Sequence, residues 1–169
     1  PGTNAITMRA ARGTSTAKTA IASGDNLGQL TFRGWDGSTF FRGASVDFTA
    51  AANFTASVGP TDIIFSTTNT SGVYNSKMKI AADGNVGIGV ASPQAALDVV
   101  GTGTSSAIIA PRATTGNRPT TLVNGMIRYN STTALFEFYQ NGGWVNYTTV
   151  SDGRLKTNIV PVQQGLNIV

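Results

Sequence analysis

Short stretches in which apolar and polar residues alternate recur along this chain, and each is soon ended by turn-forming residues. Residues 30–33 (LTFR) alternate before the turn-like segment GWDGST, and 45–49 (SVDFT) and 77–80 (KMKI) follow the same period of two. Alternation places every second side chain on one face of a strand. The intervening Gly, Asn, Asp, Ser and Thr leave no room for two helical turns. The sequence therefore predicts an all-β fold with little helix.

The chain is poor in the bulky side chains that fill a protein core. Leu, Ile, Val and Phe together make up about 23% of the 169 residues, whereas Gly alone supplies 20 residues. This fraction exceeds the level of about 20% below which disorder is expected, but it is thin for a compact monomer of this size. Either the molecule is thin and elongated, or other copies complete its core. We favour the second outcome and predict a chain that assembles with other copies of itself.

The absence of cysteine and histidine excludes several classes of site. Disulfides, thiolate or imidazole metal sites, and Ser-His or Cys-His catalytic pairs all need one of these residues. We therefore expect no metal site and no cofactor.

Charge and hydropathy exclude two kinds of partner. The net charge is +4, but the Arg and Lys residues are scattered singly instead of forming a basic stripe, so no nucleic-acid partner is expected. No run approaches the eighteen or so apolar residues of a membrane span, and no signal peptide is visible, so membrane insertion is not expected. Because the chain begins at Pro1 without a methionine, it is expected to be a fragment or a processed product.

The segment GNVGIGV (84–90) combines three apolar side chains with alternating glycines. Val86, Ile88 and Val90 are expected to point one way, while Gly87 and Gly89 leave the other face bare. Glycine weakens a strand unless another backbone comes close, so we interpret the pattern as close packing against another copy. A flexible glycine loop is the alternative. The spacing does not match a phosphate-binding fingerprint.

Residues 126–150 (MIRYNSTTALFEFYQNGGWVNYTTV) are expected to form a three-stranded β-meander. MIRYN, ALFEFYQ and WVNYTTV alternate, and Asn141-Gly142 is a strong signal for a type I′ hairpin turn. Before the meander, residues 102–125 are rich in turn-forming residues and are expected to be an extended linker. An isolated three-stranded sheet needs a packing partner, and a neighbouring copy would supply it.

Three segments in order resemble a known family. DGNVGIGVASPQAALDVVG, TTGNRPTTLVNGMIRYNSTTALFEFYQNGGWVNY and SDGRLKTNI resemble successive segments of bacteriophage tail fibres and related virion appendages. The last is similar to the opening of the intramolecular chaperone autoprocessing domain, the S74 peptidase family. DNLGQLTFRGWDG (25–37) resembles another stretch of the same fibres.

The resemblance implies an elongated, intertwined homotrimer, with a β-helix-like or β-prism-like shaft and a β-meander tip, located in the virion tail fibre and made in the host cytoplasm. Its expected divisions are a β-rich fibre or tip segment (1–74), a Gly-rich trimeric shaft segment (75–101), the linker (102–125), the meander (126–150) and the start of the chaperone domain (151–169).

The resemblance also implies a self-cleavage site. The bond between Val150 and Ser151 would be cut, with Ser151 as nucleophile and Lys156 as its basic partner. Lysine can accept the serine proton if burial or neighbouring charge lowers its pKa. Alternatively, Ser151 and Asp152 cap a short helical turn. Because the domain continues beyond Val169 in the family, we read 151–169 as a stub that is inactive here, and the chain as no enzyme.

The leading functional hypothesis is adhesion to a bacterial surface receptor, expected to be a polysaccharide. Three weak sites on one trimer gain avidity through effective concentration, and aromatic side chains suit sugar faces. The candidate receptor-binding residues are Trp35, Phe40, Phe41 and Tyr139, whereas Trp144 is assigned to the core. Other tail proteins are expected as further partners.

Two other function classes remain open. One is a polysaccharide depolymerase, which needs a pair of carboxylates, and no pair stands out among the eight acids. The other is a purely structural spacer or neck appendage. Adsorption to host cells separates the adhesin from the spacer, and sugar release identifies a depolymerase.

Overall fold

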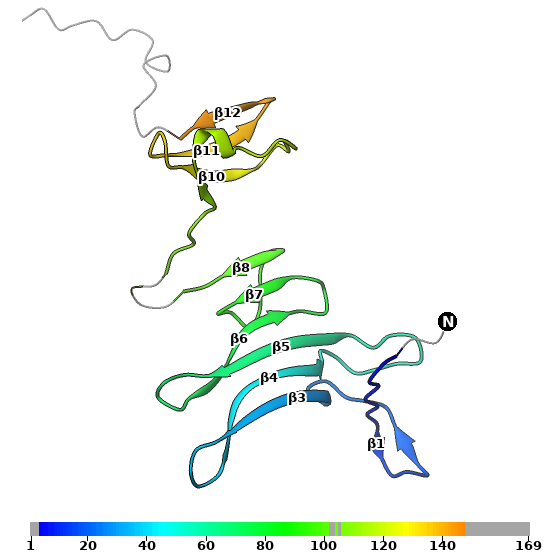
Figure 1. Ribbon diagram of the computed structural model, residues 1–169. Helices are drawn as coiled ribbons and strands as arrows, with labels where there is room; N and C mark the ends of the chain where they lie inside the picture. Colours follow the sequence, from blue (N-terminus) through cyan, green and yellow to red (C-terminus); the bar gives the residue numbers. More distant parts are fainter. Residues whose placement is uncertain (1–3, 102–103, 105, 148–169) are drawn as a thin grey trace, which may run out of the picture. The chain divides into compact units, whose positions relative to one another are not determined.

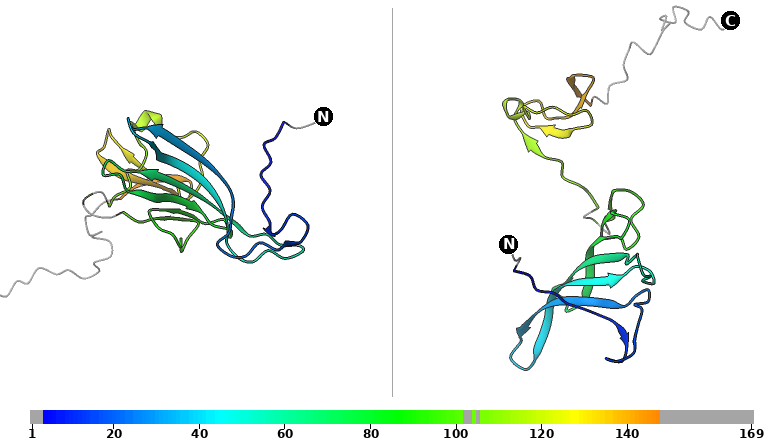
Figure 2. Two further views of the ribbon diagram at one scale, coloured as in Figure 1. Left: turned by 90° about the horizontal axis from the view of Figure 1, so that it is seen from below. Right: turned by 90° about the vertical axis from the view of Figure 1, so that its right-hand side faces the viewer.

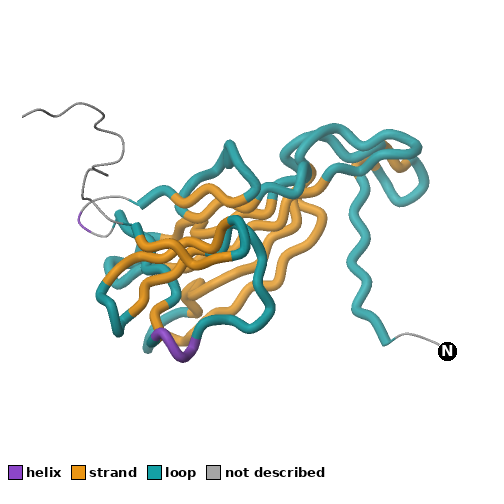
Figure 3. The backbone as a smooth tube through the Cα atoms, turned by 90° about the horizontal axis from the view of Figure 1, so that it is seen from above, coloured by secondary structure: helices purple, strands orange, loops and turns teal. Residues whose placement is uncertain are grey.

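A computed structural model describes residues 4–101, 104 and 106–147 of the chain. Two compact units make up the chain, Pro1–Ala107 and Ile108–Val169. Both are built from strands and loops (Figures 1 and 3). In the described residues the helical structure is confined to single 3-10 turns such as Thr115–Asn117 (η2). The prediction of an all-β fold with little helix is confirmed.

The first unit contains one large sheet, with strands that neighbour one another in chain order and twist relative to one another (Figures 1 and 2). Every pair is antiparallel except the last, β7 with β8, which is parallel. The six strands are β3 (Asn26–Trp35), β4 (Phe40–Ala50), β5 (Thr61–Thr68), β6 (Tyr74–Ile80), β7 (Val86–Ile88) and β8 (Leu97–Val99).

A tight turn joins β3 to β4. The Asp36 carboxylate accepts hydrogen bonds from the backbone N–H groups of Ser38 and Thr39, both at 2.7 Å. These bonds hold the pKa of Asp36 below its usual range, the Thr39 bond contributing most. Gly37 supplies the positive φ of 102° that the turn needs. The segment predicted as a turn, GWDGST, therefore contains the turn of the β3–β4 hairpin.

The glycines of GNVGIGV face the chain's own backbone. A Cβ on Gly87 would lie 2.6 Å from the Val90 carbonyl oxygen, and one on Gly89 would lie 2.2 Å from the Val100 carbonyl oxygen. Our interpretation that these glycines make room for another copy is therefore wrong, because the chain folds back over them between β7 and β8. The expected strand also ends early: Val86 and Ile88 lie in β7, and Gly89 leaves the strand with a φ of +73°.

A small hairpin precedes the large sheet. Strand β1 (Arg12–Gly13) pairs with β2 (Lys18–Thr19). The Arg12 guanidinium donates two hydrogen bonds, of 2.6 and 2.8 Å, to the Asp25 carboxylate just before β3.

The second unit contains a four-stranded sheet in the order β12-β11-β10-β9. Strands β10 (Ile127–Asn130), β11 (Leu135–Gln140) and β12 (Gly143–Asn146) form an antiparallel meander. The type I′ hairpin turn is confirmed, since Asn141 and Gly142 both have positive φ, 50° and 79°.

The segment before the meander contributes to the sheet. Strand β9 (Arg112–Ala113) pairs in parallel with β10, and η2 follows it within the stretch expected to be an extended linker. Likewise, β6 to β8 continue the same sheet as β3 to β5, although we assigned them to a separate shaft segment. In both cases backbone pairing with a neighbouring strand decided the outcome. No described helix is long and apolar enough to cross a membrane.

Each unit has very little hydrophobic interior. Among the described residues, the buried apolar side chains are Ile21, Ala50 and Tyr139. The other buried side chains are polar or charged: Ser45, Asp62, Ser66, Arg128, Asn130 and Glu137. Most of the large apolar side chains are therefore exposed or half-buried, and where they lie on the sheets indicates how the chain assembles.

Candidate assembly faces and hairpin tip

One face of the six-stranded sheet collects most of the apolar side chains of its strands, with contributions from all six. Directly paired residues on neighbouring strands share a face, so the register can be followed across the sheet: Leu30 pairs with Val46, Val46 with Phe65, and Phe65 with Met78. We call this surface face A. Its residues are Leu30, Phe32, Val46, Phe48, Ile63, Phe65, Met78, Ile80, Val86, Ile88, Leu97 and Val99.

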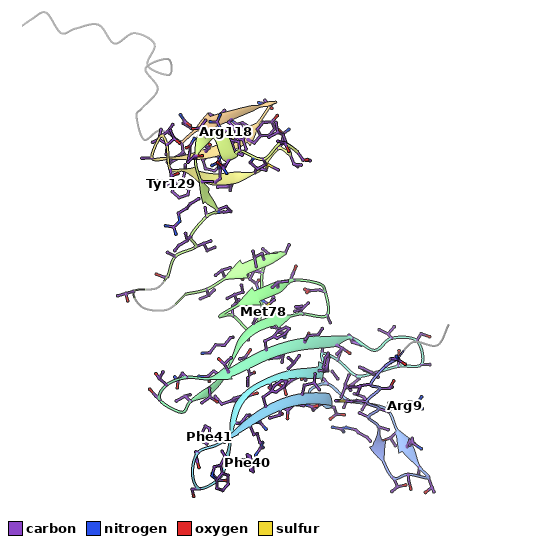
Figure 4. The ribbon with its side chains drawn as sticks, in the orientation of Figure 1. Arg9, Phe40, Phe41, Met78, Arg118 and Tyr129 are labelled. Carbon is purple, nitrogen blue, oxygen red and sulfur yellow. The ribbon has the colours of Figure 1, made fainter. Side chains whose placement is uncertain are left out.

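Nothing in the described first unit covers most of face A. None of its twelve side chains is buried, and Leu97 at its edge is 60% exposed. The N-terminal segment covers one corner only, where Met8 lies close to Gly28 and lines a shallow hollow with Leu30 and Phe48. Met78 marks the middle of the sheet in Figure 4.

The opposite face of this sheet is polar and internally hydrogen-bonded. Lys79 and Asp62 form an ion pair at 2.8 Å. Closer to the hairpin, the Asp47 carboxylate accepts hydrogen bonds from Gln29 and Ser45, and Ser45 is also hydrogen-bonded to the hydroxyl of Tyr74. The sheet is thus amphipathic, with the apolar side left open.

The sheet of the second unit also has one apolar face, and this face is rich in aromatic side chains. Ile127 pairs with Phe138, and Phe138 with Val145, so these side chains share one face of the sheet. We call this surface face B. It bears Ile127, Tyr129, Phe136, Phe138, Val145 and Tyr147, all exposed or half-buried, with edge-to-face ring pairs Tyr129–Phe136 and Phe138–Tyr147.

The interior face of the second unit holds a buried carboxylate instead of a hydrophobic core. Glu137 is 0% exposed. The Arg118 guanidinium donates to both of its oxygens, at 2.5 and 3.3 Å, and the Asn130 amide donates at 2.7 Å. The Arg118 hydrogen bond is the main reason that the pKa of Glu137 lies below its usual range, against the opposing effect of burial.

Two arginines close this cluster. The Nη1 atom of Arg128 lies 3.6 Å from Glu137 Oε2, while its Nη2 donates to the carbonyls of Ala113 and Thr114. Both arginine side chains lie over the Trp144 ring, each 5.7 Å from its centroid. Sequence reasoning missed this network because Arg118 lay in the expected linker. The only signal was Glu137 in the middle of a strand, where a charged residue needs a partner.

Two open apolar faces on one chain require a covering partner. Soluble monomers rarely expose contiguous apolar patches larger than a few hundred Å². Face A draws large apolar side chains from all six strands of its sheet and face B from the three strands of the meander, and the described interior is almost devoid of apolar residues. The expectation that a lone copy cannot complete its own core agrees with this arrangement.

The β3–β4 hairpin tip carries three of the four candidate receptor-binding residues, Trp35 at the end of β3 and Phe40 and Phe41 at the start of β4; Figure 4 labels the two phenylalanines. Trp35 and Phe40 pair across the strands, are each 60% exposed, and pack edge to face with ring centroids 5.2 Å apart. Phe41, also exposed, pairs with Gly34 and so points to the side of face A. The structure brings together two of the three aromatic side chains.

The fourth candidate lies elsewhere. Tyr139 is 9% exposed and packs edge to face on Trp144 inside the second unit. Its ring is covered by the chain itself, so we do not carry it forward as a receptor contact. The expected cleavage residues Val150, Ser151 and Lys156 lie outside the described residues.

An all-β protein with open apolar sheet faces belongs to the class that completes its fold by self-assembly. Residues 87–161 match the family model "Phage tail like trimerisation region". This stretch includes β8, all of the second unit's described strands and therefore face B. This part of the chain is thus similar to a phage-tail trimerisation region, a similarity that supports self-association.

Two solved structures share the fold. The carboxy-terminal domain of the bacteriophage T5 L-shaped tail fibre with its intramolecular chaperone domain is 17% identical, with a TM-score of 0.54. A second structure, of the carboxy-terminal domain of the bacteriophage T5 L-shaped tail fibre, is 16% identical, with a TM-score of 0.53. Each match covers 83% of this chain, but only 43% and 63% of the respective structures, less than two thirds of either. A search of curated proteins finds no match.

Proposed function

We propose that this chain is a homotrimeric structural and receptor-binding segment of a phage tail fibre, held together by faces A and B. The single observation that carries the proposal is the reversal of the usual pattern: polar residues fill the interior, and the large apolar residues lie outside. Packing three copies through these faces would remove that apolar surface from water, the main favourable contribution to association.

The assembly proposal is tested by the oligomeric state. Native mass spectrometry and sedimentation of the full chain should report a trimer that stays intact on dilution. A stable, folded monomer with faces A and B in water would overturn the proposal.

For the adhesive part of the function, we assign the hairpin tip that bears Trp35 and Phe40. Two adjacent exposed rings offer an apolar platform for a sugar face, and threefold presentation provides avidity. Because both rings lie on the side opposite to face A, assembly through that face leaves them accessible. The glycan-binding role is tested by binding of the trimer to bacterial surface polysaccharides, with loss expected for Trp35→Ala. Unchanged binding by that variant would assign the sugar site to another surface, whereas no binding by the unaltered trimer would favour a spacer role.

We further propose that SDGRLKTNI opens an autoprocessing chaperone, with Ser151 as nucleophile and Lys156 as base. Support comes from the sequence resemblance and from the chaperone domain named in one of the similar fibre structures. The test is expression of a chain extended through the whole domain. Cleavage between Val150 and Ser151 is expected, and Ser151→Ala should abolish it, whereas persistence of cleavage in that variant would disprove the assignment.

A further inference from the structure

The polar side of the β3–β4 hairpin places two arginines next to the exposed rings. Arg33 pairs directly with Arg42, one residue pair before Gly34 and Phe41 and two before Trp35 and Phe40. Since side chains alternate along a strand, both guanidinium groups lie on the same side as the Trp35–Phe40 pair. The hairpin thus combines an aromatic platform with two adjacent positive charges.

Like charges directly opposite each other on paired strands destabilise a sheet. Their side chains start from Cβ atoms about 5 Å apart. Within the described part of the chain, no carboxylate lies within ion-pair distance of either guanidinium. The nearest acids along the strands are committed elsewhere: Asp36 accepts from the turn backbone, and Asp47 accepts from Gln29 and Ser45.

The second arginine is held in position. The guanidinium carbon of Arg42 lies 4.9 Å from the centroid of the Tyr74 ring, a cation–π geometry. The Tyr74 hydroxyl is hydrogen-bonded to Ser45, which fixes the ring beneath the arginine. Arg42 is half-buried, whereas Arg33 is exposed. The Arg42 guanidinium is therefore held over Tyr74, while the Arg33 side chain can change rotamer to reach a bound ligand.

We propose that this surface, formed by Arg33, Trp35, Phe40, Arg42 and Tyr74, binds an anionic sugar of a bacterial surface polysaccharide. The rings would contact the sugar face, and the guanidinium pair would bind a carboxylate or phosphate on it, for which arginine forks are well matched. A bound anion also relieves the repulsion between the two charges. This inference rests on the proposed receptor-binding role and specifies the chemical class of the receptor.

The test measures binding of the full-chain trimer to a microarray of purified bacterial surface polysaccharides, divided into neutral, uronate-bearing and phosphate-bearing sets. The key variant is Arg33→Gln with Arg42→Gln. The matched control is Arg9→Gln with Lys18→Gln, two exposed cations in the N-terminal segment and β2. Each double variant loses two positive charges. The trimeric state of each variant is checked by native mass spectrometry.

We expect binding to one of the two anionic sets, the set itself identifying the anion. The Arg33/Arg42 variant should lose about tenfold or more in affinity, while the control stays within about twofold because distant exposed charges are screened. Binding restricted to neutral polysaccharides, or equal loss in both double variants, would overturn the anionic site but leave the adhesin role standing. No binding to any set would overturn both.

Discussion

The assembly proposal makes its sharpest prediction at a pair of phenylalanines. Phe32 lies on face A and Phe40 lies on the opposite side of the same hairpin, and their exposed fractions in a single copy are nearly equal, 65% and 60%. If the single copy were the functional form, replacing either with serine would have a similar small effect. If face A is covered by other copies, only Phe32→Ser should weaken the trimer.

The expected magnitude follows from the area that remains to be buried. Full burial of a phenylalanine contributes about 1.5–3 kcal/mol. Because Phe32 is 65% exposed, about two thirds of this contribution, or about 1–2 kcal/mol per chain, would come from trimer contacts. Three copies give about 3–6 kcal/mol, which lowers the trimer association constant by about 10²- to 10⁴-fold.

The assay is sedimentation over a dilution series, combined with thermal unfolding at several protein concentrations, because the melting temperature of an assembly depends on concentration. Phe32→Ser should shift the dissociation midpoint to higher concentration. Phe40→Ser should lose only its contact with Trp35 and leave that midpoint unchanged. Equal shifts in the two variants, or none in either, would refute the assignment of face A to the trimer contact.

The remaining predictions concern stability, two of them at Glu137 in the second unit and one at Gly89 in the first. Glu137→Gln should destabilise the second unit by about 3 kcal/mol in chemical unfolding, the lower end for breaking a buried ion pair because Arg118 is partly exposed; equal stability would show that the ion pair makes no net contribution. Because the pKa of Glu137 is lower in the folded state, its carboxylate stabilises the fold fully above the unfolded pKa of about 4.3, and this stabilisation is lost as the pH falls through the folded pKa. The difference in unfolding free energy between the wild type and Glu137→Gln should therefore shrink below about pH 4. A difference that stays constant with pH would contradict this. Gly89→Ala should destabilise the first unit by more than about 1 kcal/mol, because of its positive φ and the nearby Val100 carbonyl. Gly34→Ala, which meets open space at ordinary φ, is the matched control, and equal melting temperatures would show that the β7–β8 turn relaxes freely.

Local pattern predicted the strands and turns well where a single chemical rule decided them. Alternation identified β10 and β11, and Asn141-Gly142 identified the turn after them, because positive φ is acceptable at these two residues. The same alternation correctly put Val86 and Ile88 on one face. The shortage of bulky residues indicated a chain that needs other copies, and the apolar faces agree with that expectation.

Contacts between distant residues were the part that pattern could not predict. Glu137 is neutralised by an arginine 19 positions earlier, in a stretch whose composition resembles a linker. Gly87 and Gly89 leave space for a backbone, but the sequence does not say whether that backbone is the chain's own or a neighbour's. Tyr139 was predicted to contact a receptor, but its side chain is buried and packs against Trp144.

The amino-acid sequence by itself determined that the chain forms strands and which side chains of each strand share a face, because a period of two is a local property of the extended backbone. Only the tertiary structure decided how those faces combine. Strand register aligned twelve apolar residues from six strands into one open surface, and a register shift between Phe32 and Arg33 paired Trp35 with Phe40 instead of Phe41. Register is set by how each strand pairs with the next and by the irregularities in that pairing, so the pattern of one strand alone does not contain it.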